Sequence, residues 1–158
     1  YVDDHLLCHH KNWQSDHYEQ QTGAVAEFLG DTIYTLSSEP NKLIAIDTKE
    51  GIDRIIDILT PLVGNQVTLV RSQRDFLEMT APNVSKGRAL ARLALDNNLS
   101  LENIVSFGNA ENDISMLSET GYSVAVSNAT EHVKSVANEV CGHHNEDGVA
   151  HWIEKNLL

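Results

Sequence analysis

Residues 104–117 read IVSFGNAENDISML, and this stretch decides which fold we expect for the chain. A short apolar run predicts a strand, a loop of small, acidic and amide residues follows it, and a helical pattern begins after the loop. In open α/β sheets, ligands bind beyond the carboxyl ends of the strands, so this order predicts a ligand site in the loop. The loop carries four side chains with oxygen atoms: Asn109, Glu111, Asn112 and Asp113.

The loop allows two interpretations. Gly108 is expected to let the backbone turn sharply off the strand, since a residue without a Cβ reaches conformations that others avoid. Carboxylate and amide oxygens in such a turn suit Mg²⁺, which takes one or two carboxylates together with water and substrate phosphate. The same residues also suit an ordinary helix start, with Asn112 as the N-cap and Asp113 in the first turn. The loop by itself does not decide between them.

The composition excludes several classes of protein. The chain has 158 residues, 41% of them apolar, with no apolar run as long as the roughly 18 residues of a membrane span. No basic-then-apolar amino terminus marks a signal peptide, so we expect a cytoplasmic protein without a membrane partner. The 23 acidic residues outnumber the 11 basic ones, which argues against nucleic acid as a partner. Cys8 and Cys141 are too few for a disulfide framework, and we expect free thiols.

The first half of the chain is expected to form a small α/β unit. Residues 1–21 are polar and predicted to be irregular, and the Asp, His and Cys residues among them match no closed zinc pattern. Residues 24–29 predict a short helical patch. Strands are predicted at residues 43–46, 67–70 and 75–80. Thr48 is expected to cap a helix whose apolar stripe is made of Ile52, Ile55, Ile56 and Leu59.

The second half repeats an alternation of strands and helices. Pro82 and Asn83 punctuate the chain, and we place a domain boundary there. Strands are predicted at residues 104–107, 122–126 and 140–141, with helical faces at 129–137 and 149–157 between and after the last two. Such alternation predicts a parallel sheet with right-handed crossovers. Ser85 is expected to cap the first helix, with an inward face made of Ala89, Leu90, Leu93 and Ala94.

Lys86 falls in the first turn of that helix, which is an unfavourable place for a cation. The helix dipole favours anions at this end, so the lysine costs about 0.3 kcal/mol or somewhat more. A nearby anion would explain its presence. The alternative is a solvated surface lysine, which is the usual environment of this residue type.

Residues 83–140, together with NEDGVAHWIE at 145–154, resemble the carboxyl-terminal part of the Cof-type phosphatases of the haloacid dehalogenase superfamily. The resemblance rests on a lysine in VSKG, a loop related to GDxxND, an apolar strand with a following NA turn, and an EDGVA helix. It implies a Rossmann-like parallel sheet, present here as a partial core at residues 83–158. The SxxDFLEM segment resembles the end of the family's inserted α/β cap, so residues 1–82 are expected to be that cap, incomplete at its start.

The resemblance implies roles for four residues. Lys86 would neutralise the phosphoryl group and the attacking carboxylate, and Asn112 would hydrogen-bond the phosphate. Asp113 would help to hold Mg²⁺, directly or through water. Asn109 stands where the family has an acidic metal ligand. An amide oxygen can coordinate Mg²⁺ but brings no charge, so this departure puts metal affinity in doubt.

The family's nucleophile has no counterpart that we can assign. In the family, an aspartate in a DxD motif near the amino terminus attacks the phosphate. Asp3 and Asp4 lack the strand, the spacing and the following turn of that motif. Because the chain begins at Tyr1 with no initiator Met, we expect further sequence before it, which would carry the nucleophile.

The sequence therefore predicts a fragment of a Mg²⁺-dependent phosphatase that hydrolyses a small phosphorylated metabolite such as a sugar phosphate. The fragment is expected to be inactive alone, with the cap choosing the substrate. In the family that the chain resembles, the strand matching residues 104–107 lies beside the strand that bears the nucleophile. We therefore expect an unpaired edge here and possible self-association through it. The alternatives are a non-catalytic module that binds phosphate or a metabolite, and an interaction domain whose loop is only a capped turn.

Overall fold

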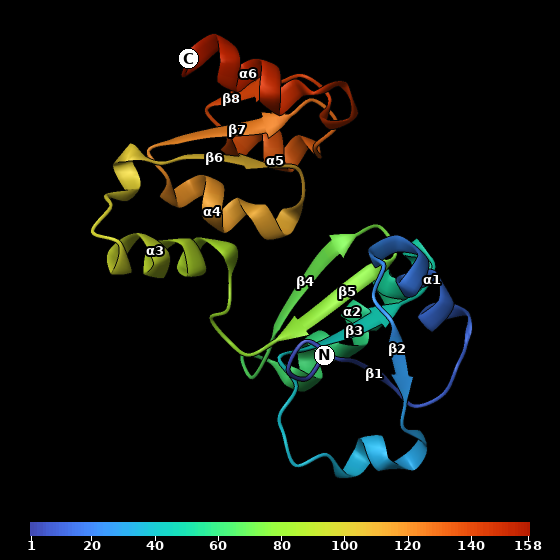
Figure 1. Ribbon diagram of the computed structural model, residues 1–158. Coiled ribbons are helices and arrows are strands. Elements are labelled where there is room, and N and C mark those ends of the chain that lie inside the picture. The colour runs from blue at the N-terminus through green and yellow to red at the C-terminus, as the bar shows by residue number, and fades with distance from the viewer. The chain divides into compact units, whose positions relative to one another are not determined.

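The computed structural model describes residues 1–158, which divide into two compact units, Tyr1–Pro82 and Asn83–Leu158 (Figure 1). Each unit has its own strands, helices and apolar core. None of the helices combines the length and the apolar character that would let it cross a membrane. The chain is of the α/β class, as predicted.

The first unit contains two separate sheets. Its elements are β1 (Leu6–Cys8), α1 (Trp13–Thr22), β2 (Ala26–Phe28), a 3-10 helix (Gly30–Thr35), β3 (Lys42–Ile46), α2 (Lys49–Val63), β4 (Thr68–Gln73) and β5 (Phe76–Thr80). Strands β1 and β2 pair in parallel, whereas β3, β5 and β4 form an antiparallel sheet in that spatial order. The three predicted strands of this half are therefore confirmed as β3, β4 and β5.

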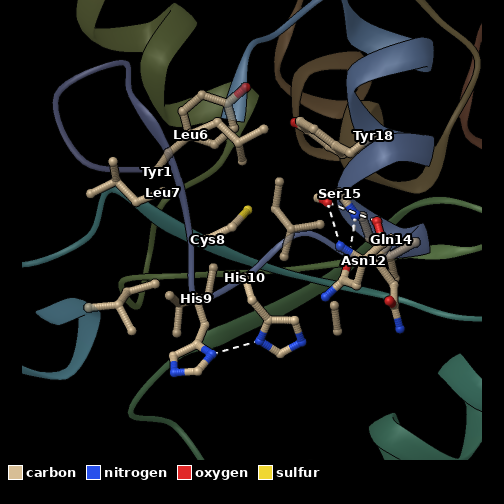
Figure 2. A pocket seen from close by; sticks show the side chains of 15 residues that line it. Tyr1, Leu6, Leu7, Cys8, His9, His10, Asn12, Gln14, Ser15 and Tyr18 are labelled. Carbon is tan, nitrogen blue, oxygen red and sulfur yellow. Dashed lines mark hydrogen bonds between the residues drawn. The ribbon is translucent and has the colours of Figure 1, made fainter. Parts of the chain in front are cut away.

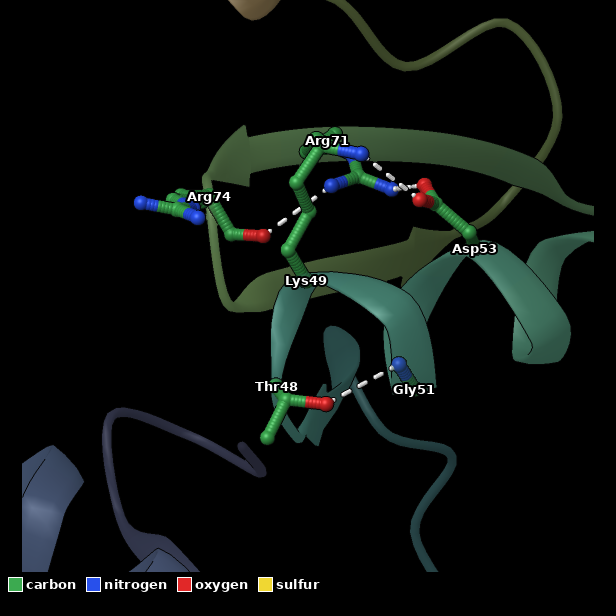
Figure 3. A network of polar contacts seen from close by, with 6 residues as sticks. All are labelled: Thr48, Lys49, Gly51, Asp53, Arg71 and Arg74. Carbon is green, nitrogen blue, oxygen red and sulfur yellow. Dashed lines mark hydrogen bonds and ion pairs between the residues drawn. The ribbon is translucent and has the colours of Figure 1, made fainter.

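Helix α2 starts as its sequence predicts. Thr48 is the N-cap and accepts a hydrogen bond from the amide of Gly51 at 3.1 Å. Asp53 of α2 pairs with Lys49 of the same helix at 2.8 Å and with Arg71 of β4, so it connects the helix to the sheet (Figure 3). The side-chain hydrogen bond from Lys49 is the main reason why the pKa of Asp53 is lowered, and Arg71 adds to it. The predicted apolar stripe is confirmed, with Ile52 fully buried.

Two elements of the first unit differ from the prediction. Residues 13–22, expected to be irregular, form α1, in which Asn12 and Ser15 make a reciprocal capping box and Gly23 ends the helix with a left-handed backbone. Residues 26–28, expected to be helical, form β2. This segment pairs in parallel with β1, with Leu6 opposite Ala26, and the pairing gives its backbone N–H and C=O groups hydrogen-bond partners.

The second unit is built on a parallel sheet. Its elements are α3 (Lys86–Asp96), a 3-10 turn (Leu101–Asn103), β6 (Val105–Gly108), a 3-10 turn (Glu111–Asp113), α4 (Ile114–Glu119), β7 (Tyr122–Val126), α5 (Glu131–Val136), β8 (Glu139–Cys141), a 3-10 turn (His144–Glu146) and α6 (Gly148–Asn156). The strands lie in the order β6, β7, β8, and both pairings are parallel. The predicted parallel sheet is confirmed.

Helices cover both faces of this sheet. Figure 1 shows α6 on one face and α4 and α5 on the other. On the α6 face, Trp152 packs edge-on against Phe107 of β6 and stacks on Tyr122 of β7. The other face carries the core of the unit, made of Leu117, Ala125, Val126, Ala129 and Val133. The main apolar core of this unit therefore lies between the sheet and helices α4 and α5.

Helix α3 buries a different face from the predicted one. Ala94 is buried as expected, but Leu93 is 59% exposed and Ala89 is exposed as well. Gly87 is buried instead. Helix α4 approaches it so closely that a Cβ at this position would lie 2.5 Å from the carbonyl oxygen of Ser115. The buried side of α3 is therefore the one that carries Gly87 and Ala94, where the helix approaches α4 closely.

Candidate functional site

The loop after β6 is centred on the carboxylate of Asp113. Its Oδ2 accepts hydrogen bonds from the backbone amides of Asn109, at 2.8 Å, and Ala110, at 3.1 Å. Its Oδ1 accepts a charge-assisted hydrogen bond from the Nζ of Lys86. The Asp113 side chain is only 4% exposed. The loop therefore folds around one buried negative charge at the carboxyl end of β6.

Gly108 gives this carboxylate its space. A Cβ at Gly108 would lie 2.7 Å from the Cβ of Asp113 and 3.0 Å from Leu117 of α4. Gly108 is not among the residues with positive φ. The expectation that glycine is needed here for an unusual backbone turn is thus wrong, and close packing against Asp113 is the physical reason.

Lys86 reaches the loop from the first turn of α3. Ser85 caps that helix as predicted, accepting a hydrogen bond from the amide of Arg88 at 3.2 Å. The amide of Gly87, one residue before Arg88, donates to the Oγ of Ser115 at 3.1 Å and connects α3 to α4. Asp113 is an anion of the kind that the position of Lys86 indicated, and it offsets the unfavourable helix dipole.

The pKa of Asp113 reports the balance of these contacts. Burial would by itself raise the pKa of this carboxyl group, but hydrogen bonds from Lys86 and from the amides of Asn109 and Ala110 outweigh burial and lower it. The ionised carboxylate therefore stabilises the fold above the pKa of the unfolded state. That contribution is lost as the pH falls through the lowered folded-state pKa.

Asn109 precedes the 3-10 turn and Asn112 lies within it, and neither side chain has the role of Asp113. Asn109 is exposed and contacts Asp113 through its backbone amide, while Asn112 is partly buried within the 3-10 turn. The alternative prediction that Asn112 caps the following helix is wrong. The carboxylate of Asp113 reaches back to the loop amides instead, so this side chain holds the turn.

Glu111 makes two side-chain contacts that were not predicted from the sequence. Its Oε1 accepts a hydrogen bond from the hydroxyl of Thr130 at 3.1 Å, and its Oε2 lies 2.8 Å from the Nδ1 of His132. Both partners belong to the start of α5, beyond the end of β7. No local signal indicates this pairing, because the partners are 19 and 21 residues away in the sequence.

The donor chemistry of the loop fits part of a Mg²⁺ site. Asn109 and Asp113 offer the oxygen ligands that this hard cation takes. Oδ2 of Asp113 already accepts two amide hydrogens, and Lys86 occupies one side of Oδ1, which leaves one acceptor position on that atom. No group of three or more His, Cys, Asp or Glu side chains converges to hold an ion. Water, phosphate and a further carboxylate would complete such a shell.

Asp3 and Asp4 lie in a tight turn in the first unit. Val2 and His5 form an antiparallel bridge, and the two aspartates between them have φ values of 47° and 67°. They therefore sit at the tip of a two-residue hairpin turn and not at the carboxyl end of a parallel strand.

The first unit also contains a pocket of about 430 Å³ between β1, β3 and α1 (Figure 2). Apolar side chains such as Leu6 and Ile44 line it together with polar ones from α1. At its rim the Nδ1 atoms of His9 and His10 are 2.7 Å apart, and the Nε2 of His9 lies 2.9 Å from Asp31. The pocket offers apolar walls with a few hydrogen-bonding groups, which is the general character of small-molecule sites.

A family model for haloacid dehalogenase-like hydrolases matches residues 1–153. Phosphatase YwpJ of Bacillus subtilis is 44% identical over 95 residues, which cover 60% of this chain and 33% of that protein. The chloroplastic endoribonuclease YBEY of Arabidopsis thaliana is 31% identical over 140 residues, or 77% of this chain and 24% of that protein. The matches thus span a quarter to a third of these relatives.

Solved structures show the same arrangement of elements. A crystal structure from Thermotoga maritima aligns with a TM-score of 0.82 and 32% identity, covering 100% of this chain and 60% of that one. A haloacid dehalogenase-like hydrolase from Bacteroides thetaiotaomicron aligns with a TM-score of 0.83, covering 98% of this chain and 59% of the other. At 22% identity, the second likeness concerns the fold alone.

Proposed function

The chain belongs to the haloacid dehalogenase-like hydrolases, and from this premise we propose that it is part of a Cof-type phosphatase that hydrolyses a small phosphorylated metabolite such as a sugar phosphate. One observation carries the proposal. The ammonium group of Lys86 and the buried carboxylate of Asp113 meet at the carboxyl end of β6 in a parallel sheet, where α/β proteins bind ligands.

In the proposed reaction, each residue of the loop has one task. The side chain of Lys86 is half exposed, so its Nζ can donate a hydrogen bond to a phosphoryl oxygen while it stays paired with Asp113. The side chain of Asn112 donates a hydrogen bond to the phosphate. Asp113 pairs with Lys86 and fixes the turn through the amides of Asn109 and Ala110. These residues bind and orient phosphate but do not attack it.

The proposal includes Mg²⁺ as cofactor, with Asn109 and Asp113 as two of its oxygen ligands. When bound, the ion supplies positive charge to the phosphoryl oxygens. It also includes a nucleophilic aspartate that lies outside these 158 residues, since Asp3 and Asp4 occupy a hairpin turn. The 158-residue chain would then be inactive alone.

We further propose that the first unit is the cap and selects the substrate. Its pocket combines apolar walls with histidine, asparagine and tyrosine side chains, which suits the organic part of a phosphorylated metabolite. YwpJ is a phosphatase, which supports a phosphorylated substrate for this chain. The acidic composition supports the absence of a nucleic-acid partner, and a cytoplasmic location without a membrane partner belongs to the same proposal.

Replacing Asn109 by aspartate tests the phosphatase and its metal together. In the complete protein, Asn109→Asp is expected to lower the Mg²⁺ concentration for half-maximal phosphate release, because a carboxylate adds a full charge to the ligand set. The measurement is initial rate against Mg²⁺ concentration with a panel of sugar phosphates. An unchanged Mg²⁺ requirement would mean that Asn109 does not face the metal.

The same assay decides between this proposal and a non-catalytic module. The neutral side chain of Asn109 favours the alternative, since it removes a charge from the usual metal ligands. A complete protein that binds inorganic phosphate in calorimetry but releases none from any ester, with or without Asn109→Asp, would establish the binding module instead.

The chain is also expected to self-associate through β6. This strand pairs only with β7, so its other edge offers unpaired backbone groups and carries no Lys or Pro to block pairing. Light scattering at tens of micromolar should therefore show oligomers, and Val105→Lys should reduce them. Val140→Lys on the opposite edge strand β8 is the matched control. A monomer that unfolds cooperatively and binds no hydrophobic dye would contradict this expectation.

A further inference from the structure

Glu111 joins the loop after β6 to the start of α5. One carboxylate oxygen accepts from Thr130 and the other pairs with His132, at 3.1 and 2.8 Å. Thr130 is also the N-cap of α5, where its hydroxyl accepts a hydrogen bond from the amide of Val133 at 3.3 Å. The carboxylate thus connects the loops that follow two neighbouring parallel strands, β6 and β7.

This contact completes the anchoring of a five-residue turn. Asp113 holds the carboxyl-terminal end of the turn to Lys86 of α3 and to the amides of Asn109 and Ala110. Glu111 holds the middle of the turn to α5. Asn112 lies between these two anchors, so each of its neighbours in the sequence is fixed to a different helix.

We propose that Glu111 is a positioning residue that fixes Asn112 for its hydrogen bond to phosphate. This inference rests on the proposed function, in which Asn112 contacts the substrate. Glu111 itself touches neither phosphate nor metal, and it acts through the placement of its neighbour.

The exposure of the Glu111–His132 pair allows a role in positioning Asn112 to be distinguished from a role in stabilising the fold. The side chain of His132 is 65% exposed and that of Glu111 is 36% exposed. Ion pairs with this much contact with water contribute little to folding, so loss of the pair should hardly change thermal unfolding. Substrate binding is more sensitive, because a shift of about 1 Å in a positioning group can cost roughly a hundredfold in rate.

The chemistry of the pair also predicts which substitution preserves it. In Glu111→Gln, the amide oxygen can still accept from Thr130, and the amide nitrogen can donate to Nδ1 of a neutral His132. The variant keeps both contacts without the charge. Glutamine should therefore behave like the native residue, whereas Glu111→Ala loses both contacts.

The first arm of the experiment uses the complete protein and a sugar phosphate. Glu111→Ala is expected to raise KM and the inhibition constant of inorganic phosphate by about tenfold or more, with the midpoint of thermal unfolding unchanged. Glu111→Gln should stay near native values. The matched control is Glu131→Ala, because Glu131 follows Thr130 on α5 but is 92% exposed and pairs only with Lys134. Equal KM values for Glu111→Ala and Glu131→Ala would overturn the proposal.

The second arm needs no activity and uses the 158-residue chain. Backbone ¹⁵N relaxation should show that Glu111→Ala and His132→Ala loosen residues 109–112, whereas Glu131→Ala does not. A turn that stays equally ordered in all three variants would overturn the role of Glu111. If the complete protein released no phosphate, the proposed function would fail, and this second arm would still decide whether Glu111 holds the turn.

Discussion

The 158-residue chain alone is expected to release no phosphate from an aryl phosphate such as p-nitrophenyl phosphate, even with Mg²⁺. Both carboxylates of the loop are already engaged, Asp113 by Lys86 and two amides and Glu111 by Thr130 and His132. Neither can attack phosphorus without giving up contacts that hold the turn. Loss of a covalent nucleophile costs about 10⁶ in kcat where it has been dissected in another hydrolase.

The measurement compares the chain with the complete protein under the same conditions. The chain should match the buffer blank, while the complete protein should turn the substrate over. Mg²⁺-dependent release by the chain that Asp113→Ala abolished would show that these residues contain a nucleophile, and that the proposed division of the active site is wrong.

Local signals in the sequence were sufficient where an element carries its own periodicity and cap. Helix α2 has both, with Thr48 at its start and a stripe that includes the buried Ile52. Helix α1 has a cap at Asn12 but no apolar stripe, since only Ser15 and Tyr18 are buried along it. Apolar periodicity therefore does not indicate α1, and its only local signals are the cap residues Asn12 and Ser15 and the terminating Gly23.

Contacts between distant segments explain the remaining differences. Segment 26–28 is a strand because β1 pairs with it, and the buried face of α3 depends on how closely Gly87 approaches α4. The candidate site divides in the same way. The resemblance to the Cof-type phosphatases implied roles at one site for Lys86 and Asp113, whereas the contacts of Glu111 with α5 depend on the packing of β6 beside β7.

Replacing Lys86 by alanine is expected to have the largest effect of any single substitution at the site. In the complete protein, Lys86→Ala should lower kcat by about 10² to 10³, which is the usual cost of removing one donor that stabilises charge in the transition state. The Mg²⁺ requirement should change little, because the oxygen ligands of the loop remain. The measurement is kcat against Mg²⁺ concentration for the native protein and the variant.

A lysine that only neutralised Asp113 would give a different result. Removing it leaves a buried carboxylate without its cation, so the pKa of Asp113 should rise and stability near neutral pH should fall. Thermal unfolding measures that loss, and the double variant Lys86→Ala with Asp113→Asn relieves it by removing the buried charge. Because Asp113 is itself a proposed metal ligand, the reference for turnover is Asp113→Asn alone. If the double variant and Asp113→Asn had the same kcat, Lys86 would act only by neutralising Asp113. If the double variant were as stable as Asp113→Asn but had a lower kcat, and Arg92→Ala on the same helix remained fully active, the charge of Lys86 would act on the phosphate itself.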